Sequence, residues 1–289
     1  MKQIDKESKF YSDQWPKSKG IVEWWGGFEK EEVAEREYKY YGLDNPNDNW
    51  NKEIAELPEF ENMTYKLNKY GYRSDDFDEL KDTKKPKFLF LGCSFAFGQG
   101  IPEETMVSKI IANEFNAVHW NLSRVGGNME GCLLQLNTFL DAGYKPDKVI
   151  AFYPLKDRQI FVGDDMFVEF HKEIYSKQHK HWLISSNETM NSWNWWLCAK
   201  AIQSLCYEHN IDLIETSFDQ SYLKILPHVL NLRGYYSNLR ALTQNEMYAR
   251  DGIHPGIAVN KLLSNVLIEH IKGLKPKDPV LNAITNPLF

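Results

Sequence analysis

The sequence contains no long apolar run, and this absence excludes a protein that crosses a membrane on helices. No stretch of the 289 residues approaches the roughly 20 consecutive apolar residues that a helix needs to span a bilayer. The N-terminal segment, residues 1–6, also lacks the apolar centre of a secretory signal peptide. We therefore expect a soluble protein that is made in the cytoplasm and has no membrane partner.

A cluster of positive charge is absent as well. The net charge is −6, and no run rich in Lys and Arg is interleaved with aromatic residues. Because nucleic-acid binding depends mainly on neutralising phosphates, we expect no nucleic-acid partner.

Cysteines are few, and none of them form a C-x-x-C pair. The chain has four: Cys93, Cys132, Cys198 and Cys206. All fall in segments with the pattern of a helix or a strand end. This favours buried thiols in a reducing compartment over disulfides.

Motifs for metals and nucleotides are missing too. The glycines at positions 98 and 100 are not followed by the Gly-Lys-Ser/Thr of a phosphate-binding loop. His171, His179 and His181 lie in a polar stretch without a carboxylate or thiol at a recognised ligand spacing, which favours a solvated loop over a metal site. We expect neither a metal nor another cofactor.

Aromatic residues, in contrast, are abundant at 14%, with nine Trp. Such rings mostly fill cores, although they also line interfaces and carbohydrate grooves. Trp193, Trp195 and Trp196 share one helical segment, where core or interface packing is favoured over a sugar platform. Residues 1–84 are polar and rich in Trp and Tyr. We expect an extension that wraps the core, contains one helix over residues 29–40, and offers an aromatic surface to a protein partner.

From residue 85 onward, strand and helix patterns alternate. Expected strands cover residues 87–91, 117–122, 148–153 and 211–216, and expected helices cover residues 103–115, 129–142, 191–209 and 257–272. Strands that alternate with helices over short links predict a parallel sheet covered on both faces. We therefore predict one α/β domain over residues 85–273, of the three-layer, flavodoxin-like kind. Residues 274–289 have the composition of an extended tail.

The first strand ends in the pattern Gly-x-Ser-x-x-x-Gly, in which Ser94 is the serine. Open α/β sheets bind their ligands at the carboxyl ends of their strands, so this hydroxyl is a candidate nucleophile. Gly92 and Gly98 suit a sharp turn from strand to loop. A tight turn with an ordinary capping serine is the alternative.

A second candidate stretch, Asp-Gly-Ile-His-Pro, occupies residues 251–255, just before the last expected helix. Asp251 and His254 are three positions apart on a loop, so the carboxylate can orient the imidazole toward a serine. Together with Ser94 they would supply the nucleophile, base and orienting acid of acyl transfer. The alternative is a loop Asp beside a surface His.

Paired glycines follow the second expected strand. Gly126 and Gly127 precede a helix, where backbone N–H groups can point toward a developing oxyanion. A plain turn before a helix explains the same pattern.

These three stretches, in this order, resemble the SGNH (GDSL) hydrolase superfamily over roughly residues 64–273. The resemblance implies that Ser94 is the nucleophile, His254 the base and Asp251 its orienting acid. It also implies an oxyanion hole built from the N–H groups of Ser94 and Gly126.

Two further details bear on this resemblance. Cys93 replaces the Asp of the family's Gly-Asp-Ser, while residues 68–73 resemble an Asn-x-x-Gly-aromatic-Arg segment that often precedes the first strand in such proteins. The overall pattern is also similar to divergent members carried by tailed bacteriophages, so an association with virions is one expectation.

One conserved sequence segment of the SGNH family differs in this chain. Lys156 stands where the family has an asparagine that donates to the oxyanion, and the loss of one such donor typically lowers a rate by about 10²–10³. Lys156 could be a charged donor, Asn128 could donate from the glycine loop, or the site could be weakened or inactive.

The resemblance implies a serine esterase that acts on a small ester or an acylated carbohydrate, for example by removing acetyl groups from a polysaccharide. Transfer of the acyl group to a sugar hydroxyl is a second possibility. A structural or binding protein that keeps the fold without catalysis, such as a virion component, is a third. The substitution at Lys156 favours this third function, whereas the set of Ser94, Asp251 and His254 favours catalysis.

Overall fold

The computed structural model describes residues 37–39, 52–156, 158–162, 167–171, 188–218, 226, 228–232 and 242–274. Within these, five parallel strands form a sheet in the order β4-β3-β5-β8-β9. The strands are β3 (Lys87–Gly92), β4 (Val118–Asn121), β5 (Lys148–Tyr153), β8 (Asp212–Ser217) and β9 (Leu230–Asn231). In chain order of these five the arrangement is 2-1-3-4-5, which is the flavodoxin-like order. The predicted fold class is confirmed.

The central strands form where the sequence has short continuous apolar runs. In β3 and β5 every residue after the first lysine is buried. Both faces of these strands are covered, so their sequences do not alternate between apolar and polar residues. The four strands expected from the sequence are found within one residue of their predicted ends.

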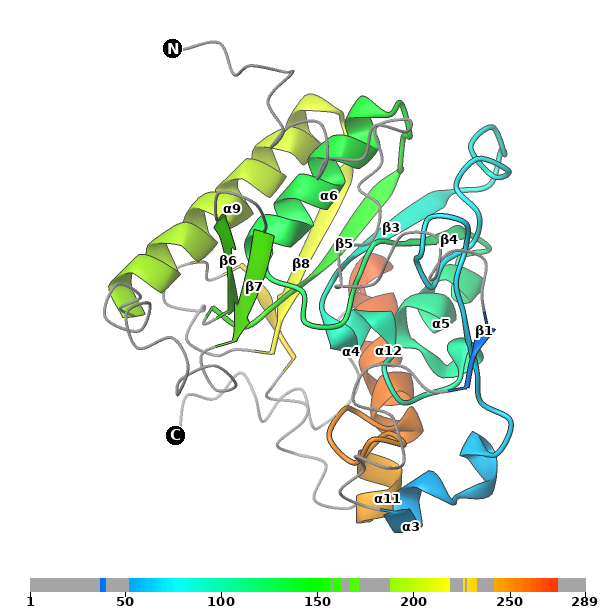
Figure 1. Cartoon of the computed structure of the whole chain (residues 1–289). Helices are drawn as coiled ribbons and strands as arrows, with labels where there is room; N and C mark the ends of the chain where they lie inside the picture. The colour runs from blue at the N-terminus through cyan, green and yellow to red at the C-terminus, as the bar shows by residue number, and fades with distance from the viewer. Residues whose placement is uncertain are drawn as a thin grey trace.

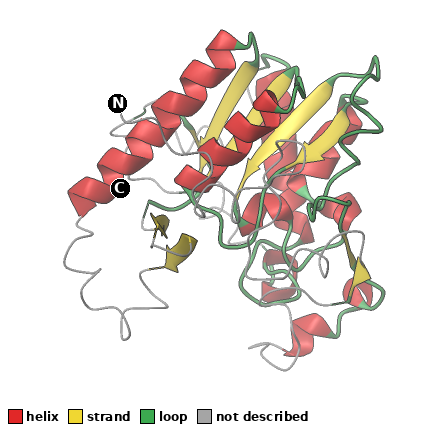
Figure 2. Ribbon diagram, turned by 45° about the horizontal axis from the view of Figure 1, so that its top comes forward, coloured by secondary structure: helices red, strands yellow, loops and turns green. Residues whose placement is uncertain are grey.

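Helices cover both faces of the sheet (Figures 1 and 2). The helices α6 (Met129–Asp141) and α9 (Glu188–Glu208) pack on one face, with Leu89, Val149 and Ala151 of the sheet beneath them. On the other face, α5 (Val107–Glu114) and α12 (Ile257–Ile271) pack over Phe90, Ile150 and Phe152. These are the two outer layers of the predicted three-layer core.

The helix expected over residues 103–115 is divided in two. A 3-10 turn, η3 (Glu103–Thr105), precedes α5, because Met106 adopts an extended conformation with φ −64° and ψ 138°. The Met106 side chain is fully buried in a third apolar cluster, so the break positions it for packing. Periodicity alone could not distinguish this from a continuous helix.

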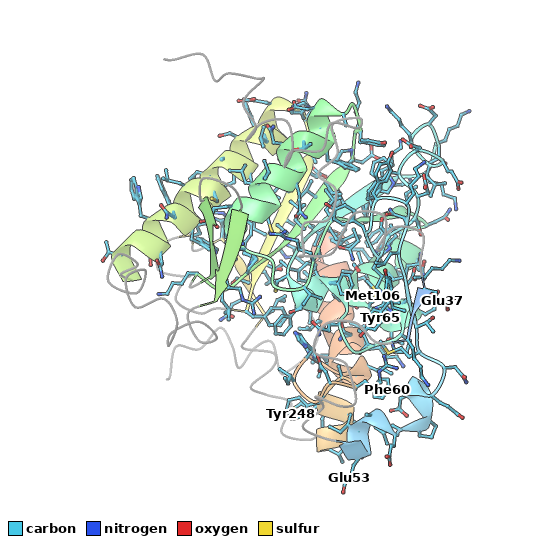
Figure 3. The ribbon with its side chains drawn as sticks, viewed as in Figure 1. Glu37, Glu53, Phe60, Tyr65, Met106 and Tyr248 are labelled. Atoms are coloured by element: carbon cyan, nitrogen blue, oxygen red, sulfur yellow. The ribbon has the colours of Figure 1, made fainter. Side chains whose placement is uncertain are left out.

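The third cluster gathers residues from the N-terminal part of the chain and from loops near the carboxyl edge of the sheet. Figure 3 shows Phe60, Tyr65, Met106 and Tyr248, which come from four different segments, on the side of the molecule away from α9. The short elements nearby are β2 (Tyr65–Lys66), α3 (Lys52–Ala55), η2 (Pro58–Phe60) and α11 (Gln244–Met247).

The helix expected over residues 29–40 is wrong at its C-terminal end. Residues 37 and 38 form β1 (Glu37–Tyr38), which pairs antiparallel with β2. Tyr38 packs against the third cluster, so tertiary contact and strand pairing override the local helical pattern there. Residues 29–36 and 40 lie outside the described residues.

A hairpin that the sequence did not predict joins β6 (Arg158–Val162) to β7 (Phe167–His171). His171 therefore belongs to a strand and not to the expected loop, while positions 179 and 181 lie outside the described residues. The expected tail is described only at Leu274, and the domain boundaries at residues 84 and 273 stay predictions.

Two of the expectations concern disulfides and membrane-spanning helices. The four cysteines are buried and form no disulfide, as expected. No helix in the described part of the chain has the length and apolar content to cross a membrane.

Candidate active site

Ser94 occupies the carboxyl end of β3, where the order of the strands reverses. It is the first residue of α4 (Ser94–Phe97) and is 2% exposed. Ligands of open α/β sheets bind at this position. The two flanking glycines are required here. A Cβ on Gly92 would lie 2.9 Å from the Phe152 carbonyl oxygen, and Gly98 ends α4 in the left-handed region at φ +73°.

A chain of hydrogen bonds links the three residues expected to carry catalysis. His254 Nε2 lies 2.7 Å from Ser94 Oγ, and His254 Nδ1 lies 2.5 Å from Asp251 Oδ2. The serine and the histidine are 160 positions apart in the sequence. The fold therefore brings the two predicted loops together in the geometry of a nucleophile, a base and an orienting acid.

Asp251 is fully buried and accepts several hydrogen bonds. Its Oδ1 accepts the backbone N–H groups of Ile253 and His254, each at 3.0 Å. Burial by itself would raise the pKa of this carboxyl, but the hydrogen bond to the His254 ring, together with these backbone donors, lowers it below its ordinary value. A carboxylate that stays charged can fix the ring orientation and stabilise an imidazolium.

Gly100 forms the joint between the two loops. Its N–H donates to Tyr65 Oη at 2.7 Å, and its carbonyl accepts the Arg250 N–H at 2.8 Å. A Cβ on Gly100 would lie 2.7 Å from Ala249 Cβ, so no side chain fits between the segments. Ala249 in turn donates its N–H to the His254 carbonyl at 2.8 Å. Contacts at Gly100 thus set the distance between the serine and histidine loops.

Arg73 also binds the loop that follows Ser94. Its Nη1 and Nη2 donate to the carbonyls of Gly98 and Ile101 at 2.6 and 2.9 Å, and its guanidinium lies 4.7 Å from the centroid of the Tyr65 ring. The side chain is completely buried. The sequence singled out residues 68–73 without a role, and the structure gives Arg73 the role of a clamp on the loop that follows Ser94.

The glycine stretch packs directly against the β3–α4 junction. Gly127 donates its N–H to the Arg124 carbonyl at 3.2 Å, which closes a turn with Gly126 at φ +78°. A Cβ on Gly127 would lie 2.7 Å from the Gly92 carbonyl oxygen, so this position needs glycine for close approach. The turn therefore lies beside the serine loop, and the role of the Gly126 N–H as an oxyanion donor stays a prediction.

The two other candidates for the oxyanion hole have different surroundings. Asn128 is buried and caps α6, with its Oδ1 accepting the Gly131 N–H at 2.7 Å. Lys156 is half-buried in the turn that follows β5, and parallel pairing with β3 places this turn at the same edge of the sheet as Ser94. Donation to an oxyanion stays a prediction for both.

Two aromatic residues beside His254 were missed by the sequence reasoning. The Phe95 ring centroid lies 5.5 Å from that of His254, with the ring planes at 67°, and Phe218 stacks on Phe95 at 4.5 Å. Phe218 follows β8 at the carboxyl edge of the sheet. Its position two residues after an expected strand, residues 211–216, was the signal that could have identified it.

In the described part of the chain, the side chains of Asp75, Glu103 and His119 have a spacing that could hold a metal ion. However, Lys109 Nζ lies 2.8 Å from Asp75 Oδ1 and 3.5 Å from Glu103 Oε1. The lysine ammonium therefore already balances the charge of these carboxylates.

No protein-family model matches the sequence, and no curated protein matches it. Similar solved structures include the psychrotrophic esterase EstA from Pseudoalteromonas sp., with 15% identity, a TM-score of 0.42, and coverage of 65% of this chain and 97% of that chain. A GDSL-like lipase from Bacteroides thetaiotaomicron has 12% identity and a TM-score of 0.39, over 80% of this chain and 99% of that chain. An acetyl xylan esterase from Butyrivibrio proteoclasticus has 13% identity and a TM-score of 0.42, over 65% and 63%. These similarities are distant.

Proposed function

We propose that this chain is a serine ester hydrolase of the SGNH type. The observation that supports this most directly is the hydrogen-bond chain from Ser94 through His254 to Asp251, buried at the carboxyl edge of a parallel sheet. A serine hydroxyl is a weak nucleophile on its own and needs a base within about 3 Å. The 2.7 Å contact between Ser94 Oγ and His254 Nε2 meets this requirement.

In the proposed reaction, Ser94 Oγ attacks the carbonyl carbon of an ester while His254 Nε2 takes the hydroxyl proton. The charged Asp251 holds the Nδ1 proton and stabilises the imidazolium that forms. His254 then donates its proton to the oxygen of the leaving alcohol, and an acyl-serine remains. Water, activated by the same imidazole, releases the acid.

The oxyanion is assigned to backbone donors. Ser94 is the first residue of α4, so its N–H has no acceptor within that helix, and the Gly126 turn lies beside it. Lys156 takes the place of the side-chain donor that the resemblance would expect. A lysine ammonium carries a full positive charge, so it would stabilise an oxyanion electrostatically.

The substrate class follows from the family resemblance. We propose a small acyl group, such as acetyl, on a carbohydrate hydroxyl. The same acyl-serine would support transfer to another hydroxyl if an acceptor excluded water from the site.

A second candidate function is a structural or binding protein without catalysis, which the presence of Lys156 at the asparagine position favours. A virion component is one example.

Labelling with a fluorophosphonate probe, together with turnover of a short-chain nitrophenyl ester, separates these functions. We expect the wild-type chain to be labelled and to hydrolyse the ester, and Ser94→Ala to lose both, because the probe needs an activated serine. A wild-type chain that neither reacts nor turns over would support the non-catalytic function. Faster ester consumption upon addition of a sugar acceptor would indicate a transferase.

Lys156→Asn addresses the oxyanion hole. Higher turnover in this variant would mean that lysine impairs the native hole, and lower turnover would mean that lysine is a working donor.

A further inference from the structure

An aromatic pair lies directly beside the imidazole of the proposed base. The Phe95 ring contacts the His254 ring at 5.5 Å between centroids, and the Phe218 ring stacks on Phe95 at 4.5 Å with the planes at 29°. The rings come from two elements that are distant in the sequence. Phe95 follows Ser94 in α4, and Phe218 follows the end of β8.

These two rings are not fully enclosed by the core. Phe90 and Phe97, on the same strand–helix unit, are completely buried, whereas Phe95 and Phe218 are both half-buried. Aromatic surface therefore stays accessible at the carboxyl edge of the sheet, next to His254. Phe218 packs against the core with part of its surface and leaves the rest exposed.

The proposed reaction determines which part of an ester lies beside the Phe95 and Phe218 rings. As the Ser94 Oγ–carbon bond forms, the bond from the carbonyl carbon to the alcohol oxygen breaks, and His254 Nε2 gives the proton taken from Ser94 to that oxygen. The alcohol half must therefore lie beside the imidazole, while the carbonyl oxygen faces the backbone donors of Ser94 and Gly126.

We infer that Phe95 and Phe218 form the wall that binds the alcohol half of the substrate. An aromatic wall is suited to an alcohol with a flat apolar face, such as an aryl ring or the C–H face of a sugar ring, and contributes little to a small alkyl alcohol. This inference rests on the proposed function and adds to it the part of the substrate that is selected.

Two acetate esters test this wall. Phenyl acetate and ethyl acetate give the same acetyl-serine, so the ratio of their kcat/KM values reports only how the alcohol half is bound and expelled. We expect Phe218→Ala to lower the ratio of phenyl to ethyl acetate by about three- to tenfold, the usual worth of an aromatic contact. Because both esters report on the same enzyme sample, the ratio does not depend on the fraction that is folded.

Phe115→Ala is the matched control. Phe115 is also a half-buried aromatic residue and packs against another ring, Phe88, at 5.4 Å, but it ends α5 away from the proposed site. We expect its ratio to equal that of the wild type. Phe218→Leu, which keeps apolar bulk without a ring face, should lower the ratio as Phe218→Ala does.

The outcomes separate this inference from the proposed function. If Ser94 is labelled and both esters are hydrolysed, but Phe218→Ala and Phe218→Leu keep the wild-type ratio, the wall is refuted and the esterase stands. If the wild-type chain is neither labelled nor active, the proposed function fails, and the inference fails with it. A fall in the ratio in both Phe218 variants but not in Phe115→Ala supports the wall.

Discussion

His119 and Asp251 are both buried, but their surroundings favour opposite charge states. Asp251 is buried but surrounded by donors, so its pKa is lowered and the charged form is kept. His119 is also buried, and the surrounding apolar core, with the positive charges of Lys109 and Arg73, lowers its pKa to about 3, even though Asp75 acts in the opposite direction. Its Nε2 lies 2.9 Å from Ser108 Oγ. The native state therefore holds a neutral His119, whereas an unfolded chain would protonate it near pH 6.5.

This difference predicts acid sensitivity that begins above the range in which carboxylates titrate. Between pH 6.5 and 4.5 the unfolded state binds a proton at His119 that the native state does not, so stability falls as the pH falls. We expect the free energy of unfolding of the wild type to decrease more steeply than that of His119→Gln, by up to about 1.4 kcal/mol per pH unit. Urea unfolding at a series of pH values would measure this. Equal slopes for the two proteins would contradict it.

At the scale of elements, the site depends on contacts between loops more than on the helices themselves. Arg73 binds the loop that follows α4 through two hydrogen bonds. In the same loop, Gly100 contacts the segment that carries Asp251 and His254. The sheet supplies the common edge. Hydrogen bonds through Gly100 then set the distance between Ser94 and His254.

Two glycine variants test this joint. Gly100 and Gly273 both have positive φ, at +77° and +68°, but a Cβ at Gly100 would meet Ala249 Cβ at 2.7 Å, whereas nothing lies within 4 Å of one at Gly273. We expect Gly273→Ala to lower the free energy of unfolding by about 1 kcal/mol, and Gly100→Ala by roughly 2–4 kcal/mol.

Activity should distinguish the two variants further. A shift of about 1 Å in a catalytic group can cost roughly 10²-fold in rate, so turnover per folded molecule should fall on that order in Gly100→Ala and stay unchanged in Gly273→Ala. Thermal unfolding and ester kinetics measure both effects. Wild-type turnover in Gly100→Ala would show that the joint does not position the site.

At the scale of the whole molecule, residues before the first central strand are part of the core. Phe77 is completely buried, and its ring contacts those of Trp120, Phe139 and Tyr144 at 6.4, 5.2 and 6.1 Å. Tyr72 is buried in the same cluster. The helical layer of α6 is therefore packed partly against side chains that come from the N-terminal side of the predicted boundary at residue 84.

We therefore expect a chain that begins at Lys85 to lose cooperative folding. Removal of the buried rings would expose Trp120 and Phe139, and with Arg73 it would also remove the clamp on the serine loop. Such a chain should keep far-UV dichroism but lose near-UV dichroism and bind the dye ANS, whereas the full-length chain should show both dichroism signals and not bind ANS. A sharp thermal transition in the shortened chain would mean that residues 85–273 fold alone. The single change Phe77→Ala should cost about 3–5 kcal/mol.

Local sequence patterns were sufficient to predict the α/β class, the four main strands to within one residue, and the positions of the glycine, serine and histidine stretches at strand or helix ends. These features depend on apolar periodicity and on backbone requirements at turns, which residues close in sequence express directly. The strand β1 and the break at Met106 were not predicted, because each depends on pairing or burial against distant segments. The hairpin of β6 and β7 was not predicted either, although it pairs neighbouring segments.

The contact between Ser94 and His254 was established by the folded structure, since 160 positions separate the two residues. Their approach requires a particular strand order and the contacts at Gly100. The folded structure also brought Arg73 to the carbonyls of Gly98 and Ile101 and stacked Phe218 on Phe95. Local patterns report which side of an element is apolar, but they carry no information about which remote backbone groups a buried guanidinium will bind or which ring will stack on another. These contacts form only when the layers of the fold pack together.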